Sequence, residues 1–208
     1  MIHSAISLAA RPENIEFVAY CDEDDYTMKD FYSPQVNLII GPRLTVSKMT
    51  NICFESSSGD IIMYAADDII FKTKSWDLIV IENLTKKACL CFGNDLGQKK
   101  LSIATHGFVT REFALINKSL LPELFAANFC DTWVTSIARM ARCSNFLPHL
   151  IIEHMHPAWG KSDQDDTYAA RNSSRTFLKL WLKFRVTLPR RVILAIKIII
   201  YNFASRSS

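Results

Sequence analysis

Short apolar runs alternate with polar, turn-forming stretches along the first half of the chain. Apolar runs that stop at Asp, Gly or Pro predict β-strands, whereas the wider spacing of apolar residues over 44–56 predicts a helix. A short helix is also favoured before Pro12, because proline disfavours helical backbone in the residue that precedes it. The elements expected here are helices at 3–10 and 44–56 and strands at 15–20, 36–40 and 61–65.

The second half combines longer helical patterns with one clear strand. At 150–156 the alternation of residues predicts a strand with Ile152, His154 and His156 on one face. Strands that alternate with helices predict an α/β fold, with a mostly parallel central sheet flanked by helices and with amphipathic helices at the C-terminus. The remaining candidates are strand or helix at 76–83 and 88–92, and helices at 113–125 and 131–142.

Positive charge is concentrated at the C-terminus. Residues 171–208 hold nine of the 24 Lys and Arg residues and none of the 21 Asp and Glu residues, so the rest of the chain is acidic. We therefore expect a catalytic body at 1–170 and a basic helical tail at 171–208. The apolar run 192–204 is shorter than the ~20 residues that span a bilayer. Two interpretations remain: the tail lies on an anionic membrane surface, or it packs on the body. No nucleic-acid partner is expected.

The composition is that of a globular domain, with 49% hydrophobic and 22% charged residues. The first residues lack the basic segment and long apolar run of a secretory signal. The six cysteines include no Cys-x-x-Cys pair of the kind that holds zinc, so free thiols in a reducing compartment are the better interpretation. We expect a cytoplasmic protein, peripheral on the inner face of a membrane if the tail binds lipid.

Two groups of aspartates follow predicted strands. Asp67 and Asp68 come directly after the strand at 61–65, and Asp22 and Asp24 close an earlier strand. Open α/β sheets bind ligands at the carboxyl ends of their strands. Carboxylate oxygens there suit Mg²⁺ or Mn²⁺, and such an ion can hold a diphosphate. The alternative is a solvated turn or a helix cap, since aspartate is a good cap.

Three residues of the second half add further chemistry to these carboxylates. Asp131 opens a predicted helix, whose dipole favours the ionised carboxylate that a general base needs. His154 and His156 lie on one strand face, where a neutral imidazole could bind a metal. Taken alone, Asp131 is better explained as a helix cap, and His154 and His156 as a pair of surface histidines.

Five short motifs occur in order over about residues 4–170. Together they resemble a family-two-type glycosyltransferase with the glycosyltransferase-A fold, which is Rossmann-like, and in particular the small bacterial and phage members of that group. The motifs are Arg-Pro-Glu-Asn-Ile-Glu-Phe-Val-Ala-Tyr-Cys-Asp at 11–22, Gly-Asp-Ile-Ile-Met-Tyr-Ala-Ala-Asp-Asp-Ile-Ile-Phe at 59–71 with Trp-Asp at 76–77, His-Gly-Phe at 106–108, Asp-Thr-Trp at 131–133, and Glu-His-Met-His-Pro at 153–157.

The resemblance implies a role for each matching residue. Asp131 matches the catalytic base of inverting members. Asp68 matches the metal-binding aspartate, and His156, or else His154, matches a histidine near the metal and the diphosphate. The metal would be Mn²⁺ or Mg²⁺. The remaining expected residues are Asp22, Asp24, Arg43 and Asp67 for the nucleotide sugar, and His106 and Gly107 for the acceptor.

These roles predict a metal-dependent, inverting transfer of a sugar from a nucleotide diphosphate to a hydroxyl of a glycan or lipid-linked acceptor. The alternative is a catalytically impaired glycosyltransferase-like binding module, associated with a membrane through its tail. A third option is another nucleotide-handling α/β enzyme, such as a nucleotidyltransferase. The chain has no glycine-rich phosphate loop, which disfavours dinucleotide and P-loop enzymes.

Glycosyltransferase-A folds begin with a strand that lines the nucleotide pocket. We find no apolar strand before the helix at 3–10. A missing central strand would leave the hydrogen-bonding groups of its neighbour uncovered. We therefore expect a natural truncation, a misassigned start, or another segment in place of this strand.

Overall fold

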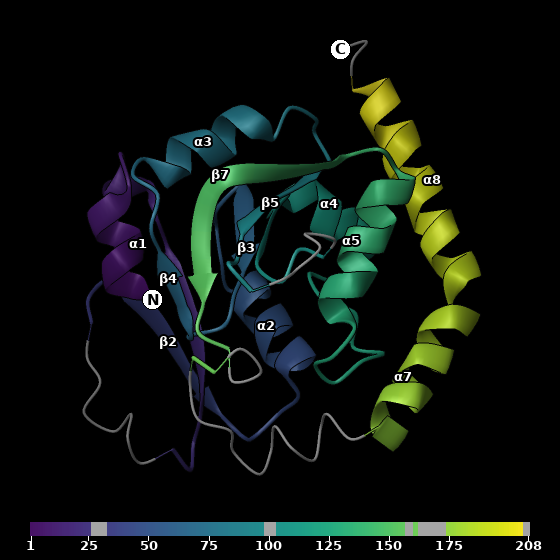
Figure 1. Cartoon of the computed structure of the whole chain (residues 1–208), viewed down its shortest axis with the longest axis horizontal. Coiled ribbons are helices and arrows are strands. Elements are labelled where there is room, and N and C mark those ends of the chain that lie inside the picture. The colour runs from purple at the N-terminus through teal and green to yellow at the C-terminus, as the bar shows by residue number, and fades with distance from the viewer. Residues whose placement is uncertain (26–32, 98–102, 157–159, 162–173, 206–208) are drawn as a thin grey trace.

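The structure is a computed structural model of the whole chain, and it describes residues 1–25, 33–97, 103–156, 160–161 and 174–205. It is a mixed α/β fold with a curled five-stranded sheet, a separate two-stranded sheet and helices around them (Figure 1). The predicted α/β class is thus confirmed. The junction between the expected body and tail, at 170–171, lies outside the described residues.

The five-stranded sheet is mixed, and the prediction of a mostly parallel sheet was wrong. Its strand order is β3-β6-β5-β7-β4, and only β5 and β7 pair in parallel. Strand β6 is antiparallel to β3 and β5, and β4 is antiparallel to β7. Both β4 and β6 are very short, and the sequence pattern did not identify them. The strands are β3 (Ile61–Tyr64), β4 (Ile69–Phe71), β5 (Leu90–Asn94), β6 (Gly107–Thr110) and β7 (Ser144–His154).

Strand β7 bends, and the bend lets it pair with two different neighbours (Figure 1). Its first part pairs with β5 until the register jumps between Gly93, opposite Leu147, and Asn94, opposite Ile151. A side chain on Gly93 would collide with the carbonyl oxygen of Leu150, so a glycine is required at this crossing. The last part of β7 then pairs with β4. The register jump is a β-bulge, and it turns the end of β7 toward β4.

The second sheet contains β1 (Phe17–Asp22) and β2 (Val36–Gly41), which pair in parallel. Both strands were predicted, as was the aspartate group that begins at Asp22, the last residue of β1. Helix α2 (Val46–Glu55) lies where the apolar spacing over 44–56 predicted a helix, and it packs on β1. Past the end of α2, the backbone N–H of Ser58 donates to the Glu16 carboxylate at 2.8 Å.

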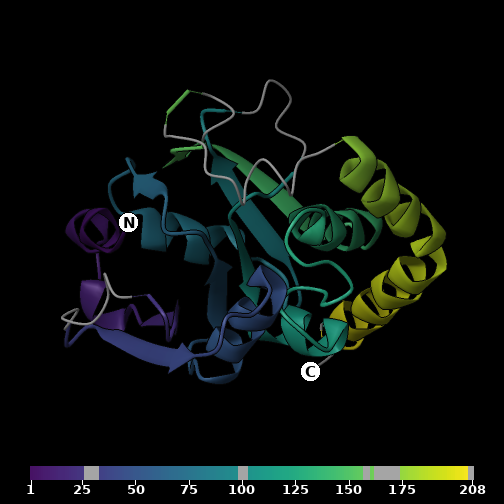
Figure 2. The same ribbon diagram turned by 90° about the horizontal axis from the view of Figure 1, so that it is seen from below.

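Helices pack on both faces of the five-stranded sheet, because successive strand residues point to opposite faces. On one face α1 and α3 pack against residues such as Phe108 and Ile152. On the other face α4, α5 and α8 pack against residues such as Val109. Figure 2 shows α7 and α8 outside α5. The helices are α1 (Ile2–Leu8), α3 (Trp76–Asn83), α4 (Arg111–Asn117), α5 (Cys130–Met140), α7 (Ser174–Val186) and α8 (Leu188–Ala204), with a 3-10 turn at Pro12–Asn14.

The Trp-Asp pair of α3 holds the N-terminal segment against the sheet. The indole N–H of Trp76 donates to the carbonyl of Ala5 at 2.8 Å. The Asp77 carboxylate accepts the backbone N–H groups of Ala10 and Arg11 at 2.7 and 2.9 Å. Burial alone would raise the pKa of Asp77, but these N–H groups hold it below its ordinary value. Asp77 is therefore a structural residue.

Candidate metal centre

Three side chains from distant parts of the sequence meet at one end of the five-stranded sheet. Asp68 lies just before β4, His106 lies just before β6, and His154 ends β7. One ligand atom of each lies within 4.8 Å of the others. The carboxyl ends of β3, β5 and β7 and the amino end of antiparallel β6 all reach this edge. We call Asp68, His106 and His154 the triad.

Strand pairing places His154 beside Asp68. Ile69 of β4 is paired with His154 of β7, and the N–H of Met155 donates to the carbonyl of Asp68 at 2.8 Å. The two side chains then meet, with 3.1 Å between His154 Nε2 and Asp68 Oδ2. The prediction that Ile152 and His154 share one strand face is confirmed, whereas His156 lies beyond the end of β7.

His106 is buried but has no polar partner in the part of the chain that the structure describes. Its side chain is 7% exposed, and neither ring nitrogen has a hydrogen bond to a described residue. Burial, followed by the nearby charge of His154, lowers its pKa to about 3, so the imidazole is neutral at pH 7. Its ring centroid lies 4.4 Å from that of His154. A neutral imidazole with an open lone pair is the form that binds metal ions.

Asp68 supplies the anionic ligand. Burial acts to raise its pKa, but the hydrogen bond and charge of His154 outweigh burial and hold the pKa below the ordinary value. Its Oδ1 atom is buried and accepts no hydrogen bond from the described residues. Buried polar atoms of native proteins are nearly always satisfied, so the open atoms of Asp68 and His106 are available to a metal ion or a water molecule.

Asp95 was not identified from the sequence, although it supports this edge of the sheet. It follows β5, and its carbonyl accepts the N–H of His154 at 3.1 Å. Its carboxylate accepts the hydroxyl of Thr105 at 2.9 Å and the N–H of Gly97 at 3.0 Å. Asp95 thus connects the chain before His106 to the end of β7. The sequence signal was an aspartate after the apolar run 88–92, the same pattern that singled out Asp68.

Asp131 lies in the first turn of α5. Its Oδ1 atom accepts the N–H of Thr132 at 2.6 Å and the Thr132 hydroxyl at 3.2 Å. Burial nevertheless raises its pKa above the ordinary value. A raised pKa makes the carboxylate a stronger base near neutral pH. Asp131 is not the N-cap of α5, a position that Phe129 occupies.

Three other predicted residues lie around the triad in different settings. The ring of His156 makes an edge contact with that of His154, with centroids 4.8 Å apart, so His156 lies beside the triad and His106 takes the place expected for it. Asp67 is exposed to solvent. Gly107 is buried in β6, where a side chain would collide with the ring of Tyr64.

Three of the four predicted nucleotide-sugar residues, Asp22, Asp24 and Arg43, form a separate group at the end of the other sheet. Arg43 Nε lies 2.9 Å from Asp22 Oδ2, and another guanidinium nitrogen of Arg43 lies 3.5 Å from Asp24 Oδ1. The hydrogen bond to Asp22, together with the charge of Asp24, raises the pKa of Arg43. The carboxylates of this group therefore already pair with a cation of the chain, the guanidinium of Arg43.

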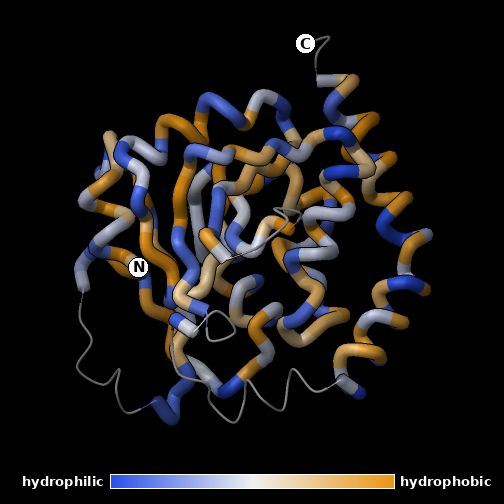
Figure 3. Tube along the Cα trace, in the orientation of Figure 1, coloured by the Kyte–Doolittle hydropathy of each residue, from blue (hydrophilic) through white to orange (hydrophobic). Residues whose placement is uncertain are grey.

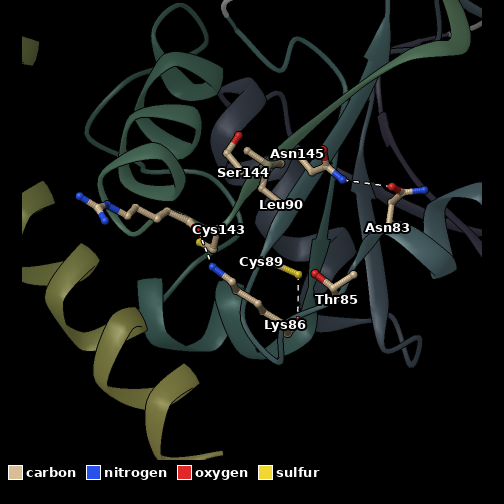
Figure 4. A pocket seen from close by; sticks show the side chains of 9 residues that line it. Asn83, Thr85, Lys86, Cys89, Leu90, Cys143, Ser144 and Asn145 are labelled. Carbon is tan, nitrogen blue, oxygen red and sulfur yellow. Dashed lines mark hydrogen bonds between the residues drawn. The ribbon is translucent and has the colours of Figure 1, made fainter. Parts of the chain in front are cut away.

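A small hollow lies at the opposite end of β5 and β7 (Figure 4). Among the residues that line it are Lys86, Cys89 and Asn145, and the lining includes no carboxylate or imidazole of the described chain. The Lys86 ammonium donates to the carbonyl of Arg142. Because Leu90 and Ser144 begin β5 and β7, this hollow lies at the amino ends of the strands, away from the triad.

Two imidazoles and one carboxylate define the chemistry of the triad. Mg²⁺ prefers oxygen ligands, whereas imidazole suits Mn²⁺ less than it suits Fe²⁺ or Zn²⁺. Two histidines and one carboxylate on one side of an ion leave other positions open for a substrate. Comparisons of the chain with protein-family models, with curated proteins and with solved structures found no match.

Proposed function

We propose that the chain is a divalent-metal-dependent transferase that moves a sugar from a nucleotide diphosphate to an acceptor hydroxyl. The observation that carries this proposal is the triad, with a buried neutral His106 and an ionised Asp68 at the strand ends. Open α/β sheets bind their ligands at this edge. The ordered motifs that resemble a glycosyltransferase supply the choice of substrate class.

In this proposal the triad binds the metal ion and Asp131 of α5 is the general base. Asp68, His106 and His154 would hold the ion, and a cation there would neutralise the charge of a leaving diphosphate. Asp131 accepts the proton of the acceptor hydroxyl, and its raised pKa suits this task near neutral pH. His156 borders the triad and could hydrogen-bond a substrate phosphate. A glycan or a lipid-linked sugar would provide the hydroxyl.

Nucleotide-sugar turnover tests the proposal directly. The protein is incubated with UDP- and GDP-sugars and with Mn²⁺, Mg²⁺, Zn²⁺ or Fe²⁺, and release of UDP or GDP is measured. We expect Asp131→Asn to reduce turnover by about 100-fold or more while metal binding stays intact. Asp68→Asn should remove both turnover and metal binding. Exposed His149 lies on β7 as His154 does, so His149→Ala is the control that should retain both.

A non-catalytic metal-binding module is the second candidate. It is favoured by the two hydrogen bonds from Thr132 that Asp131 already accepts, because they tie up one oxygen of the expected base. In this case the protein would bind metal, and it would bind UDP or GDP in the presence of metal, with no turnover of any sugar donor. Calorimetry beside the turnover assay separates the two candidates.

A further inference from the structure

Helix α8 has one apolar face buried against the body. Leu194, Ala195 and Ile198 are buried there in the core shared with α4 and α5. Near its end, the amide of Asn202 exchanges two hydrogen bonds with the backbone of Ala88, both at 2.8 Å. These contacts fix the rotation of α8, so its opposite face must point away from the body.

Helix α7 is fixed in a similar way. The buried guanidinium of Arg191 donates to the hydroxyl of Ser136 at 2.6 Å and to the carbonyl of Phe184 at 2.7 Å. The ammonium of Lys183 donates to the carbonyl of Leu124 at 2.6 Å. The outer faces of α7 and α8 are therefore a defined surface, which we call the tail face.

The tail face is strongly apolar. Its large apolar residues are each between 39 and 74% exposed, which leaves on the order of 1,000 Å² of apolar surface in total. Figure 3 shows hydrophobic positions interspersed with hydrophilic ones along both helices. The exposed apolar residues are Leu178, Trp181, Leu182, Val186, Val192, Ile193, Ile196, Ile199, Ile200 and Phe203.

The same helices carry positive charge only. Between Ser174 and Ser205 the chain holds seven Lys and Arg residues and no Asp or Glu. Apart from buried Arg191, these cations are exposed. A lipid bilayer with acidic headgroups has an anionic surface over an apolar interior. An exposed apolar face bordered by cations complements both layers. The exposed cations are Arg175, Lys179, Lys183, Arg185, Arg190 and Lys197.

The helices suit a position in the plane of the bilayer surface. Within the described ranges, no helix has both the length and the apolarity needed to cross a membrane. In addition, one face of α8 is packed against the body, so only the opposite face can enter lipid. A helix with one apolar face can lie at the headgroup level with about 5–10 Å of its width immersed.

The charge pattern argues against a second copy of the chain as the partner. A two-fold symmetric contact through the tail face would place the same patch on both sides, so that its cations meet a surface whose charges are also all positive. Like charges brought together in an interface oppose association. No acidic residue of Ser174–Ser205 is present to balance them.

We propose that the tail face binds the surface of an anionic lipid bilayer. Exposed apolar side chains of α7 and α8 enter the boundary between headgroups and acyl chains, and the bordering cations contact the acidic headgroups. The body stays outside the membrane, held by the buried faces of the same helices. This binding requires no metal at the triad, so its test is independent of the proposed enzymatic activity.

Flotation of the full-length protein with vesicles tests this proposal. The vesicles contain phosphatidylcholine alone or phosphatidylcholine with phosphatidylglycerol. We expect binding to the anionic vesicles, weaker binding to the neutral ones, and a loss with rising salt. The double variant Arg190→Gln/Lys197→Gln should weaken binding roughly 30-fold, from about fivefold for each cation. The double variant Ile200→Glu/Phe203→Glu should not bind at all.

A matched control excludes general effects of the added charge. Leu115 on α4 is 61% exposed, as Ile200 is, but it lies outside the tail face, so Leu115→Glu should bind like the wild type. Circular dichroism checks that each variant is folded. The proposal is overturned if the wild type floats with neither kind of vesicle, or if folded Ile200→Glu/Phe203→Glu floats as well as the wild type. It is equally overturned if the tail face instead mediates a dimer that these glutamates dissolve.

Discussion

Replacing His106 with leucine should affect the metal-free and the metal-bound protein in opposite directions. The imidazole is almost fully buried, and neither ring nitrogen has a partner among the described residues. With a pKa of about 3 it carries no charge at pH 7, so the substitution removes no ion pair. In the absence of metal, His106 is therefore a buried polar group without a hydrogen-bond partner among the described residues.

The expected size of each effect follows from this burial. An unsatisfied buried polar group costs about 1–3 kcal/mol, and an apolar side chain of similar size removes this penalty. Metal-free His106→Leu should thus unfold at a higher temperature, by about 2–4 °C for each kcal/mol in a chain of this size. A metal ion at 100 times its dissociation constant should stabilise the wild type by about 2.7 kcal/mol. His106→Leu should lose this gain.

The assay is thermal unfolding with EDTA and with a titration of Mn²⁺, Zn²⁺ or Fe²⁺. His149→Ala serves as the control, because exposed His149 lies on β7 outside the triad. It should match the wild type with and without metal. The reasoning is refuted if His106→Leu is less stable than the wild type in EDTA, as expected for an ordinary packed core residue. It is also refuted if the variant keeps the metal-dependent rise.

Three further substitutions test individual contacts. Asp68→Asn should weaken metal binding more than about 100-fold in calorimetry, because the ligand loses its charge. Asp77→Ala should lower the free energy of unfolding at pH 7 by about 2–3 kcal/mol in urea titrations, since two N–H groups lose a charged acceptor. The folded-state pKa of Asp77 is lowered, so this difference is complete above the unfolded pKa of about 4 and shrinks as pH falls below it. Gly93→Ala should destabilise the fold by about 1–3 kcal/mol through collision with Leu150, whereas Gly59→Ala, with ordinary contact distances, should change stability little.

Local patterns in the sequence were enough to predict most elements. The strand at 61–65, the helix at 131–142 and the strand face that carries His154 all appear where periodicity and breakers indicated them. Periodicity works here because one face of each element is buried in a core. The segment at 76–83 remained strand or helix, and the structure shows the helix α3.

Two short strands of the five-stranded sheet were not predicted from the sequence. Ile69–Phe71 and Gly107–Thr110 are too brief to show a period, and they became strands only through pairing with β7, β3 and β5. Because both pair antiparallel, they also changed the sheet from mostly parallel to mixed. Pairing between distant segments depends on the whole fold, which a local pattern does not contain.

In the candidate metal centre, too, some features follow from local sequence patterns and others only from contacts between distant segments. The sequence by itself singled out Asp68 and the pair His154 and His156, because a carboxylate after a strand and histidines on a strand face are local features. That Asp68 and His154, 86 positions apart, touch each other was decided by the pairing of β4 with β7. The tertiary structure alone chose His106 as the third member, because burial without a hydrogen-bond partner is a property of packing, and packing is set by contacts between distant parts of the chain.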